Sequence, residues 1–206
     1  MKKILVILDP AHGSDVAGKR SPDGKHEEWK WSRERLKELA PKLIELGYTV
    51  VWTNTTDNEI GLTVRKNTAS QFAKQHPDLV SLLFSLHNDA SGITPEWRSA
   101  SGVSVWTSIG KTTSDIFADI FLQCFIDLIP DIRHRIYSPK PLERDFENNF
   151  TVLMGAYSAV LLECLFQDNK EDVAKLQNPE FNKSVVRCVI EAFDRCNEYV
   201  TQKLTK

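Results

Sequence analysis

The fold of this chain is decided by the stretch KKILVILDPAHG, residues 2–13. Five consecutive aliphatic residues, 4–8, are typical of a strand that is buried on both faces, and Asp-Pro ends the run. His12 follows this strand at once. Open α/β sheets usually assemble their sites just beyond the carboxyl ends of parallel strands, so the position of His12 indicates a site at that edge.

Length and composition limit the classes of protein to which the chain can belong. Its 206 residues suffice for one sizeable core, and we expect a single domain over residues 1–206. Apolar residues make up 41% and charged residues 26%, and no window approaches the roughly 18 uninterrupted apolar residues of a membrane helix. The formal net charge of -2 gives no basic field that would attract nucleic acid. We therefore expect a globular protein without nucleic-acid binding or membrane insertion.

The amino terminus and the cysteines bear on the compartment. The short apolar run after Lys2 and Lys3 stops at Asp9 and lacks a small-residue cleavage site, so we interpret it as a strand and not as a signal peptide. The chain is then expected to stay in the cytoplasm until it is released, unless a leader has been trimmed from it. Four cysteines lack the CxxC spacing of metal or redox sites, and we expect small buried hydrophobic residues at Cys124, Cys164, Cys188 and Cys196.

Strand and helix patterns alternate along the rest of the chain. Apolar spacing predicts helices over residues 29–46, from 62 to just before Pro77, and over 111–128 and 179–203. Strands are predicted at residues 48–53, 79–86, 102–107, 150–154 and 158–162, with a short one around 135–137. This alternation predicts an α/β fold with three layers, in which helices flank a mostly parallel twisted sheet.

Four polar residues fall at comparable places in this pattern. His12 and His87 directly follow strands, Glu28 stands at the entrance of a helix, and Glu163 ends an apolar strand. Two imidazoles and one carboxylate are a recurrent ligand set for catalytic zinc, which keeps a fourth position for water. A carboxylate at the end of an apolar strand is poorly solvated, which raises its pKa toward the range useful for proton transfer.

Each of these residues also has an ordinary structural explanation. Glu28 could simply be a first-turn glutamate that the helix dipole favours, and Glu163 could form a salt bridge with one of the arginines. A single histidine after a strand is usually a polar loop residue. The joint pattern is more informative than its parts, because all four residues are expected at one edge of the sheet.

Several motifs resemble the zinc-dependent N-acetylmuramoyl-L-alanine amidases of the amidase-3 type. They are DPAHG at residues 9–13, Glu28 at the start of a helix, the Leu62, Arg65 and Ala69 pattern, and FSLHNDA at residues 84–90. The sequence ECLFQDN at residues 163–169 is similar to the closing motif of the family. The resemblance extends from residue 3 to about residue 200. It implies the three-layer fold of the zinc amidases, which is of the phosphorylase/hydrolase-like type.

Carried over by position, the resemblance implies a Zn²⁺ ion held by His12, Glu28 and His87, with Glu163 as the catalytic acid/base. The implied reaction is hydrolysis of the amide between the lactyl group of N-acetylmuramic acid and L-alanine in peptidoglycan. Glu27 competes with Glu28 as the ligand. We prefer Glu28 because counting from it places the apolar residues of the helix at the offsets that the family uses.

The sequence departs from the family pattern in places that leave all four residues intact. Ala11 replaces a glycine that is usual before the histidine, which requires only that position 11 does not need a positive φ. Ser70 replaces a common asparagine, and Tyr157 a common proline. Arg65 matches a basic position of the family, and its helical spacing favours a structural ion pair.

Two loops are predicted to contact the substrate, and two alternative functions stay open. Loops 88–101 and 131–149 are candidates for substrate contact through Trp97, Arg98, Tyr137, Arg144 and Asn149. One rival is a zinc peptidase or deacylase that acts on another amide, although the HExxH motif is missing. The other is a catalytically inactive module that binds the cell wall. Without a visible leader or a separate wall-binding domain, the chain resembles a phage or prophage endolysin.

Overall fold

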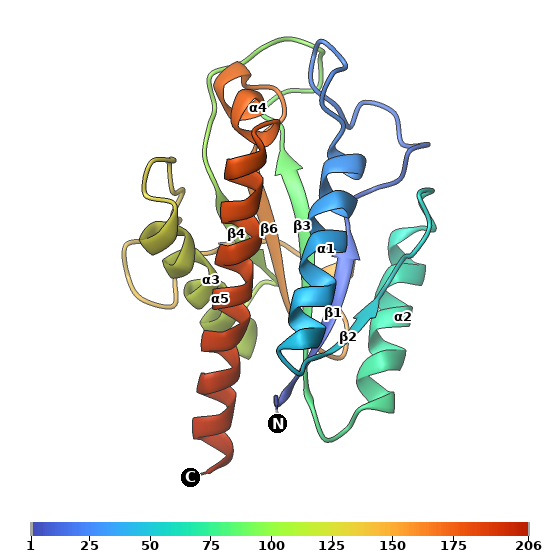
Figure 1. Ribbon diagram of the computed structural model, residues 1–206, viewed down its shortest axis with the longest axis vertical. Coiled ribbons are helices and arrows are strands. Elements are labelled where there is room, and N and C mark those ends of the chain that lie inside the picture. The colour runs from blue at the N-terminus through green and yellow to red at the C-terminus, as the bar shows by residue number, and fades with distance from the viewer. Residues whose placement is uncertain (1, 206) are drawn as a thin grey trace.

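A six-stranded sheet forms the centre of the molecule in the computed structural model, which describes residues 2–205 (Figure 1). The strand order is β2-β1-β3-β6-β4-β5. The strands are β1 (Ile4–Pro10), β2 (Thr49–Trp52), β3 (Val80–Asp89), β4 (Ser104–Thr107), β5 (Phe146–Glu147) and β6 (Ser158–Phe166). Neighbouring strands are parallel except for the antiparallel pair of β4 and β6. The predicted α/β fold with a mostly parallel sheet is confirmed.

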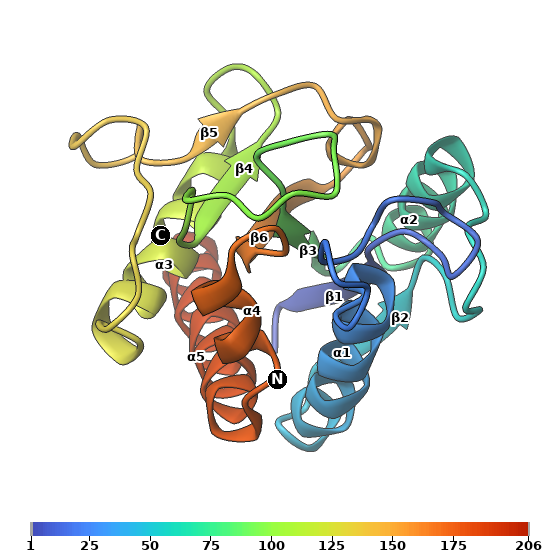
Figure 2. The ribbon, with the colours of Figure 1, turned by 90° about the horizontal axis from the view of Figure 1, so that it is seen from above.

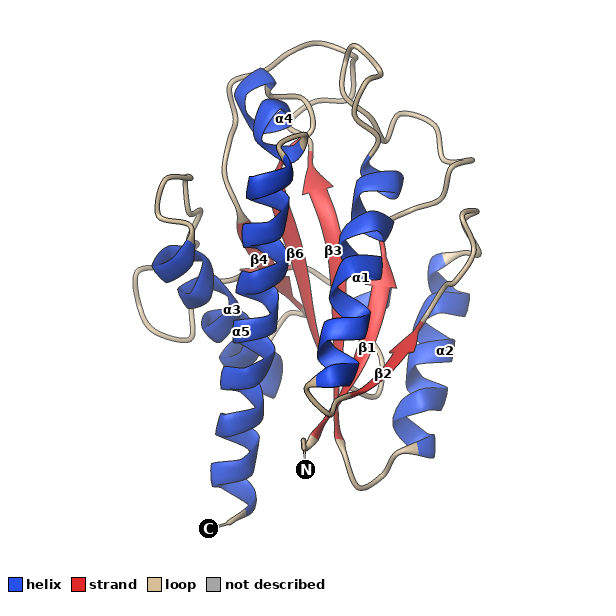
Figure 3. Cartoon of the chain, in the orientation of Figure 1, coloured by secondary structure: helices blue, strands red, loops and turns tan. Residues whose placement is uncertain are grey.

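Helices cover both faces of the sheet, as Figures 2 and 3 show. On one face lie α1 (Glu28–Glu45), α3 (Thr113–Leu128) and α5 (Pro179–Leu204), while α2 (Leu62–Gln75) and the 3-10 helix η1 (Thr151–Leu153) lie on the other. The short helix α4 (Lys170–Leu176) connects β6 to α5. Alternate residues of β1 enter different cores, since Val6 joins the cluster with α1, α3 and α5, and Ile7 joins the cluster with α2. This explains why residues 4–8 are aliphatic without interruption.

Local signals set the starts of the later helices. The Thr112 side chain accepts a hydrogen bond from the backbone of Ser114, and Asp115 accepts one from the backbone of Thr112, so the two side chains form a capping box at α3. Asn178 caps α5, and Pro179 occupies its first turn.

Two predicted strands are wrong. Residues 135–137 form no strand, and the short edge strand β5 lies further along at Phe146–Glu147. Residues 150–154 contain the 3-10 helix η1, whose Val152 and Leu153 are buried against the core that includes α2. A short apolar run fits a strand or a buried helical turn equally well, so periodicity could not distinguish the two.

Two further strands are longer than the sequence patterns predict. β3 continues through His87 to Asp89, and β6 continues through Glu163 to Phe166. His87 and Glu163 are partners in the parallel register, so neither lies beyond the end of its strand. The register shifts after this pair, where Leu165 adopts a positive φ of 63°. This irregularity is typical of a β-bulge, which bends a strand locally and is frequent beside active sites.

Two further features bear on the predictions made from composition: the burial of the cysteines and the character of the helices. All four cysteines are buried and free of disulfides, as expected. Within residues 2–205, no helix combines the length and the apolar character needed to cross a membrane.

Candidate metal centre

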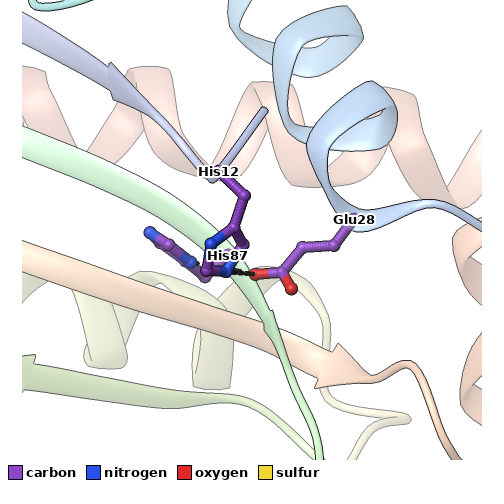
Figure 4. Close-up of side chains that lie close together, drawn as sticks. All are labelled: His12, Glu28 and His87. Atoms are coloured by element: carbon purple, nitrogen blue, oxygen red, sulfur yellow. Dashed lines mark hydrogen bonds and ion pairs between the residues drawn. The ribbon is translucent and has the colours of Figure 1, made fainter. Parts of the chain in front are cut away.

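Three side chains from distant parts of the sequence meet at the carboxyl ends of β1 and β3 (Figure 4). His12 lies just beyond β1, Glu28 is the first residue of α1, and His87 lies in β3. His87 Nδ1 is 2.9 Å from Glu28 Oε1, and His12 Nε2 is 3.3 Å from the same oxygen. The structure therefore brings together the three residues that the sequence predicts as metal ligands.

The spacing of these atoms fits a metal ion. One ligand atom from each side chain lies within 4.8 Å of the other two. Tetrahedral zinc bonds of about 2.0–2.1 Å separate ligand atoms by roughly 3.3 Å, which small side-chain movements would produce here. Among residues 2–205, His12, Glu28 and His87 are the one group of three or more histidine, cysteine or acidic side chains that meets this spacing. Glu27 does not belong to it.

Charge in this cluster suits metal binding. Burial opposes ionisation of Glu28, but hydrogen bonds from His12 and His87 lower its pKa far below the ordinary value of 4.5. Burial lowers the pKa of His87 and outweighs the opposing effect of Glu28. An ionised carboxylate and a neutral imidazole are the forms that bind a metal ion.

Two further groups hold the Glu28 carboxylate in place. The backbone N–H of Asn88 donates to Oε1 at 3.2 Å, and Gln167 Nε2 donates to Oε2 at 3.3 Å. Such secondary contacts orient a ligand for its metal. Gln167 comes 139 residues after Glu28, and no sequence pattern indicated this contact.

Glu163 lies beside the cluster, on the strand next to His87. Its Oε2 atom is shielded from solvent and forms no hydrogen bond with the protein groups that the structure describes. Burial raises the pKa of Glu163 well above its ordinary value of 4.5, and the charges of Glu28 and Asp89 raise it further. This carboxyl group is therefore able to hold and release a proton at higher pH than an exposed glutamate.

A cavity of about 450 Å³ joins these four residues. Its lining includes His12, Glu28, His87 and Glu163, together with Lys19, Arg65, Asn149, Phe150 and Gln167. Of the five loop residues expected to contact substrate, only Asn149 lines this cavity. The others contact protein side chains elsewhere: Arg144 pairs with Asp119, Arg98 lies near Asp168, Trp97 lies beneath Lys170, and Tyr137 packs against Phe146.

Comparison of the sequence with known protein families identifies the family to which the chain belongs. Residues 6–195 match the family described as N-acetylmuramoyl-L-alanine amidase. The chain belongs to this amidase family. It is therefore a peptidoglycan amidase, in agreement with the resemblance seen in its motifs. No curated protein sequence matches the chain.

Solved structures support the fold of this amidase. The N-acetylmuramoyl-L-alanine amidase from Clostridium difficile 630 superposes with a TM-score of 0.78 at 24% identity, covering 93% of this chain and 95% of that one. Ami1 from Mycobacterium smegmatis gives 0.77 at 16% identity, covering 96% and 98%. The catalytic domain of CD27L endolysin, which targets Clostridia difficile, gives 0.64 at 16% identity, covering 95% and 98%.

The turn that carries His12 in this amidase is strained and well supported. His12 has a positive φ of 42°, a conformation that costs free energy for a residue other than glycine. The Arg33 guanidinium donates hydrogen bonds of 2.7 Å to the carbonyl oxygens of Ala11 and His12. Ala11 itself is not among the residues with positive φ, so the missing glycine of the motif causes no strain at position 11.

Proposed function

We propose that His12, Glu28 and His87 of this amidase hold a catalytic zinc ion, and that Glu163 is the catalytic acid/base. The observation that carries the proposal is that the three ligand atoms lie within 4.8 Å of one another in the cavity that Glu163 also lines. Two nitrogens and one oxygen are a common protein ligand set of catalytic zinc.

The ligands and the metal have separable roles. A zinc ion at such a site supplies Lewis acidity, which polarises the amide carbonyl and lowers the pKa of a water molecule. His12, Glu28 and His87 fix the position of the ion, and Asn88 and Gln167 fix the carboxylate of Glu28. The residues at the carboxyl ends of β1, β3 and β6 and at the start of α1 thus position the reacting groups together.

Glu163 moves the proton in this proposal. Its carboxylate accepts a proton from the attacking water as the new C–O bond forms at the lactyl carbonyl. It returns that proton to the alanine nitrogen as the C–N bond breaks, which releases a lactyl carboxylic acid and a free amine. The raised pKa of Glu163 supports both steps, since a proton-transfer group works best when its pKa is close to the working pH.

Digestion of purified peptidoglycan tests the bond that is cleaved. We expect new N-terminal alanine on the released peptides and no new carboxyl termini within the stem. Free carboxyl-terminal residues from the stem would instead indicate a zinc peptidase. The same assay would identify an inactive wall-binding module, which would bind the polymer and release nothing.

The role of a phage or prophage endolysin stays a prediction. It is supported by the likeness of the fold to the catalytic domain of CD27L endolysin.

We also propose that residues 1–206 form one catalytic domain, because α5 near the carboxyl end packs in the same core as β1 and α1. Limited proteolysis that leaves one resistant fragment, and clearing of cell-wall suspensions by the added protein, are the expected results.

A further inference from the structure

A second cavity of about 480 Å³ lies beside the catalytic one, between loops 18–24 and 90–95. Ala90 and Gln167 line both cavities. The two cavities are therefore adjacent, and Ala90 and Gln167 stand at the boundary between them.

Two residues that line the second cavity each carry a buried acceptor atom without a partner among residues 2–205. Gln167 is 2% exposed and Asp168 is 5% exposed, and both line this cavity. Gln167 Oε1 and Asp168 Oδ1 accept no hydrogen bond from any group in residues 2–205. An unsatisfied buried acceptor costs free energy, so both oxygens favour a ligand that brings N–H or O–H donors.

The Asp168 carboxylate is held firmly at this position. Its Oδ2 atom accepts hydrogen bonds from the backbone N–H groups of Ser91 and Gly92 and from the Ser91 hydroxyl. Arg98 Nε lies 3.9 Å from the same oxygen, and the other oxygen, Oδ1, accepts no hydrogen bond from residues 2–205.

Each of the two cavities is lined by a positively charged side chain. Lys19 lines the catalytic cavity, and the exposed Arg20 lines the second one. Neither forms an ion pair within the part of the chain that the structure describes. Ile93, which is fully exposed, and Pro22 add apolar surface to the second cavity. The cavity thus combines a cation, an apolar wall and buried acceptors.

We propose that this stem subsite, defined by Arg20, Ile93, Gln167 and Asp168, binds the peptide on the amine side of the scissile amide. The proposal rests on the proposed function, in which that amine belongs to alanine. Arg20 pairs with a carboxylate of the residue that follows alanine, and the buried oxygens accept from peptide N–H groups. A peptide fits better than the sugar, because N-acetylated sugars are uncharged once the lactyl carboxyl group is in the amide and would leave Arg20 unpaired.

Peptide binding tests the subsite without relying on catalysis. The probes are an alanyl-glutamyl peptide amide with a free side-chain carboxylate and its alanyl-glutaminyl counterpart, titrated into the metal-loaded protein by calorimetry. We expect the wild type to prefer the carboxylate form, and Arg20→Gln to weaken its binding by about tenfold and to abolish the preference. Lys25→Gln is the matched control, since Lys25 is an exposed cation of the same loop that does not line this cavity. Equal binding by wild type and Arg20→Gln would overturn the subsite.

Hydrolysis of two substrates separates this inference from the proposed function. Arg20→Gln should raise KM for an N-acetylmuramoyl peptide that carries the glutamyl carboxylate, while kcat/KM for N-acetylmuramoyl-L-alanine methylamide stays unchanged. Equal loss on both substrates would overturn the subsite while the amidase activity stands. Selective peptide binding without hydrolysis of either substrate would overturn the proposed function while the subsite stands.

Discussion

Arg65 holds the carboxylate of Asp9 with two parallel hydrogen bonds, from Nε to Oδ1 at 2.8 Å and from Nη2 to Oδ2 at 2.6 Å. Both side chains are almost completely buried. The pair joins α2 to the end of β1, three residues before His12. The structural role expected for Arg65 is thereby confirmed, and its partner is one that the sequence patterns did not identify.

Arg65→Met should destabilise the protein strongly. The substitution leaves Asp9 as a buried charge with no cation beside it, a change that typically costs about 3–5 kcal/mol. Urea unfolding measures this cost. Arg195→Met is the control, because Arg195 is about one-third exposed and pairs with surface carboxylates, so its removal should cost at most about 1 kcal/mol. Equal costs for the two variants would contradict the structural importance of the Asp9 pair.

Stability should also depend on pH through Asp9. Burial would raise the pKa of Asp9, but Arg65 and hydrogen bonds from Ser85 and Thr53 together lower it below 3.8. A carboxyl group whose pKa is lower in the folded state stabilises the protein above its unfolded pKa and loses that contribution as the pH falls through the folded value. The free-energy advantage of wild type over Asp9→Asn should thus be constant at neutral pH and shrink below about pH 4. If the free-energy advantage of wild type over Asp9→Asn grew as the pH fell, the lowered pKa of Asp9 would be contradicted.

Metal content should distinguish Glu28 from its neighbour Glu27. Glu28→Gln replaces an ionised ligand, so this variant should no longer retain zinc at one ion per chain after gel filtration. Glu27→Gln should keep it, because Glu27 lies outside the cluster. Added zinc should raise the free energy of unfolding of wild type and Glu27→Gln by about 2.7 kcal/mol at a free concentration of 100 times Kd, with no such gain for Glu28→Gln. Zinc loss from Glu27→Gln alone would reverse the assignment.

Glu163→Gln should abolish most of the activity and leave the metal in place. Loss of a positioned acid/base typically slows a reaction by about 10²–10⁴-fold, and glutamine has nearly the same shape. Stability should not fall, because Glu163 Oε2 has no hydrogen bond to lose. Release of N-terminal alanine from peptidoglycan gives the rate, and metal analysis of the same sample shows that the ligands are intact. Full activity in this variant would exclude Glu163 as the acid/base.

Sequence patterns predicted that the three candidate ligands would lie together, because their positions depend on local signals. The aliphatic run before Asp9 sets β1, and Glu28 opens α1, as the helical spacing indicates. Parallel strands then place His12 and His87 at the same edge of the sheet. These steps use neighbouring residues and the general geometry of α/β folds, whereas the choice of Glu28 over Glu27 came from the family resemblance.

The features that the sequence patterns did not predict depend on contacts between segments that are distant in the sequence. The pairing of His87 with Glu163 follows from the register of β3 and β6, which neither strand determines alone. Gln167, the residue after β6, donates a hydrogen bond to Glu28 at the start of α1, a contact that spans 139 residues of sequence. Val152 and Leu153 of the 3-10 helix η1 are buried in the cluster that includes residues of α2, a packing that the local apolar run could not indicate.

Ala11→Gly tests the one residue of the first motif that departs from the family pattern. Ala11 is fully buried and lies outside the positive-φ region, where glycine would bring an advantage. Glycine at this position should therefore lower the free energy of unfolding by about 0.5–1 kcal/mol, since it adds freedom to the unfolded chain and removes a buried methyl group. Zinc content and kcat should not change, because Arg33 still holds both carbonyl groups of the turn. A stabilised Ala11→Gly variant would show instead that alanine strains the His12 turn.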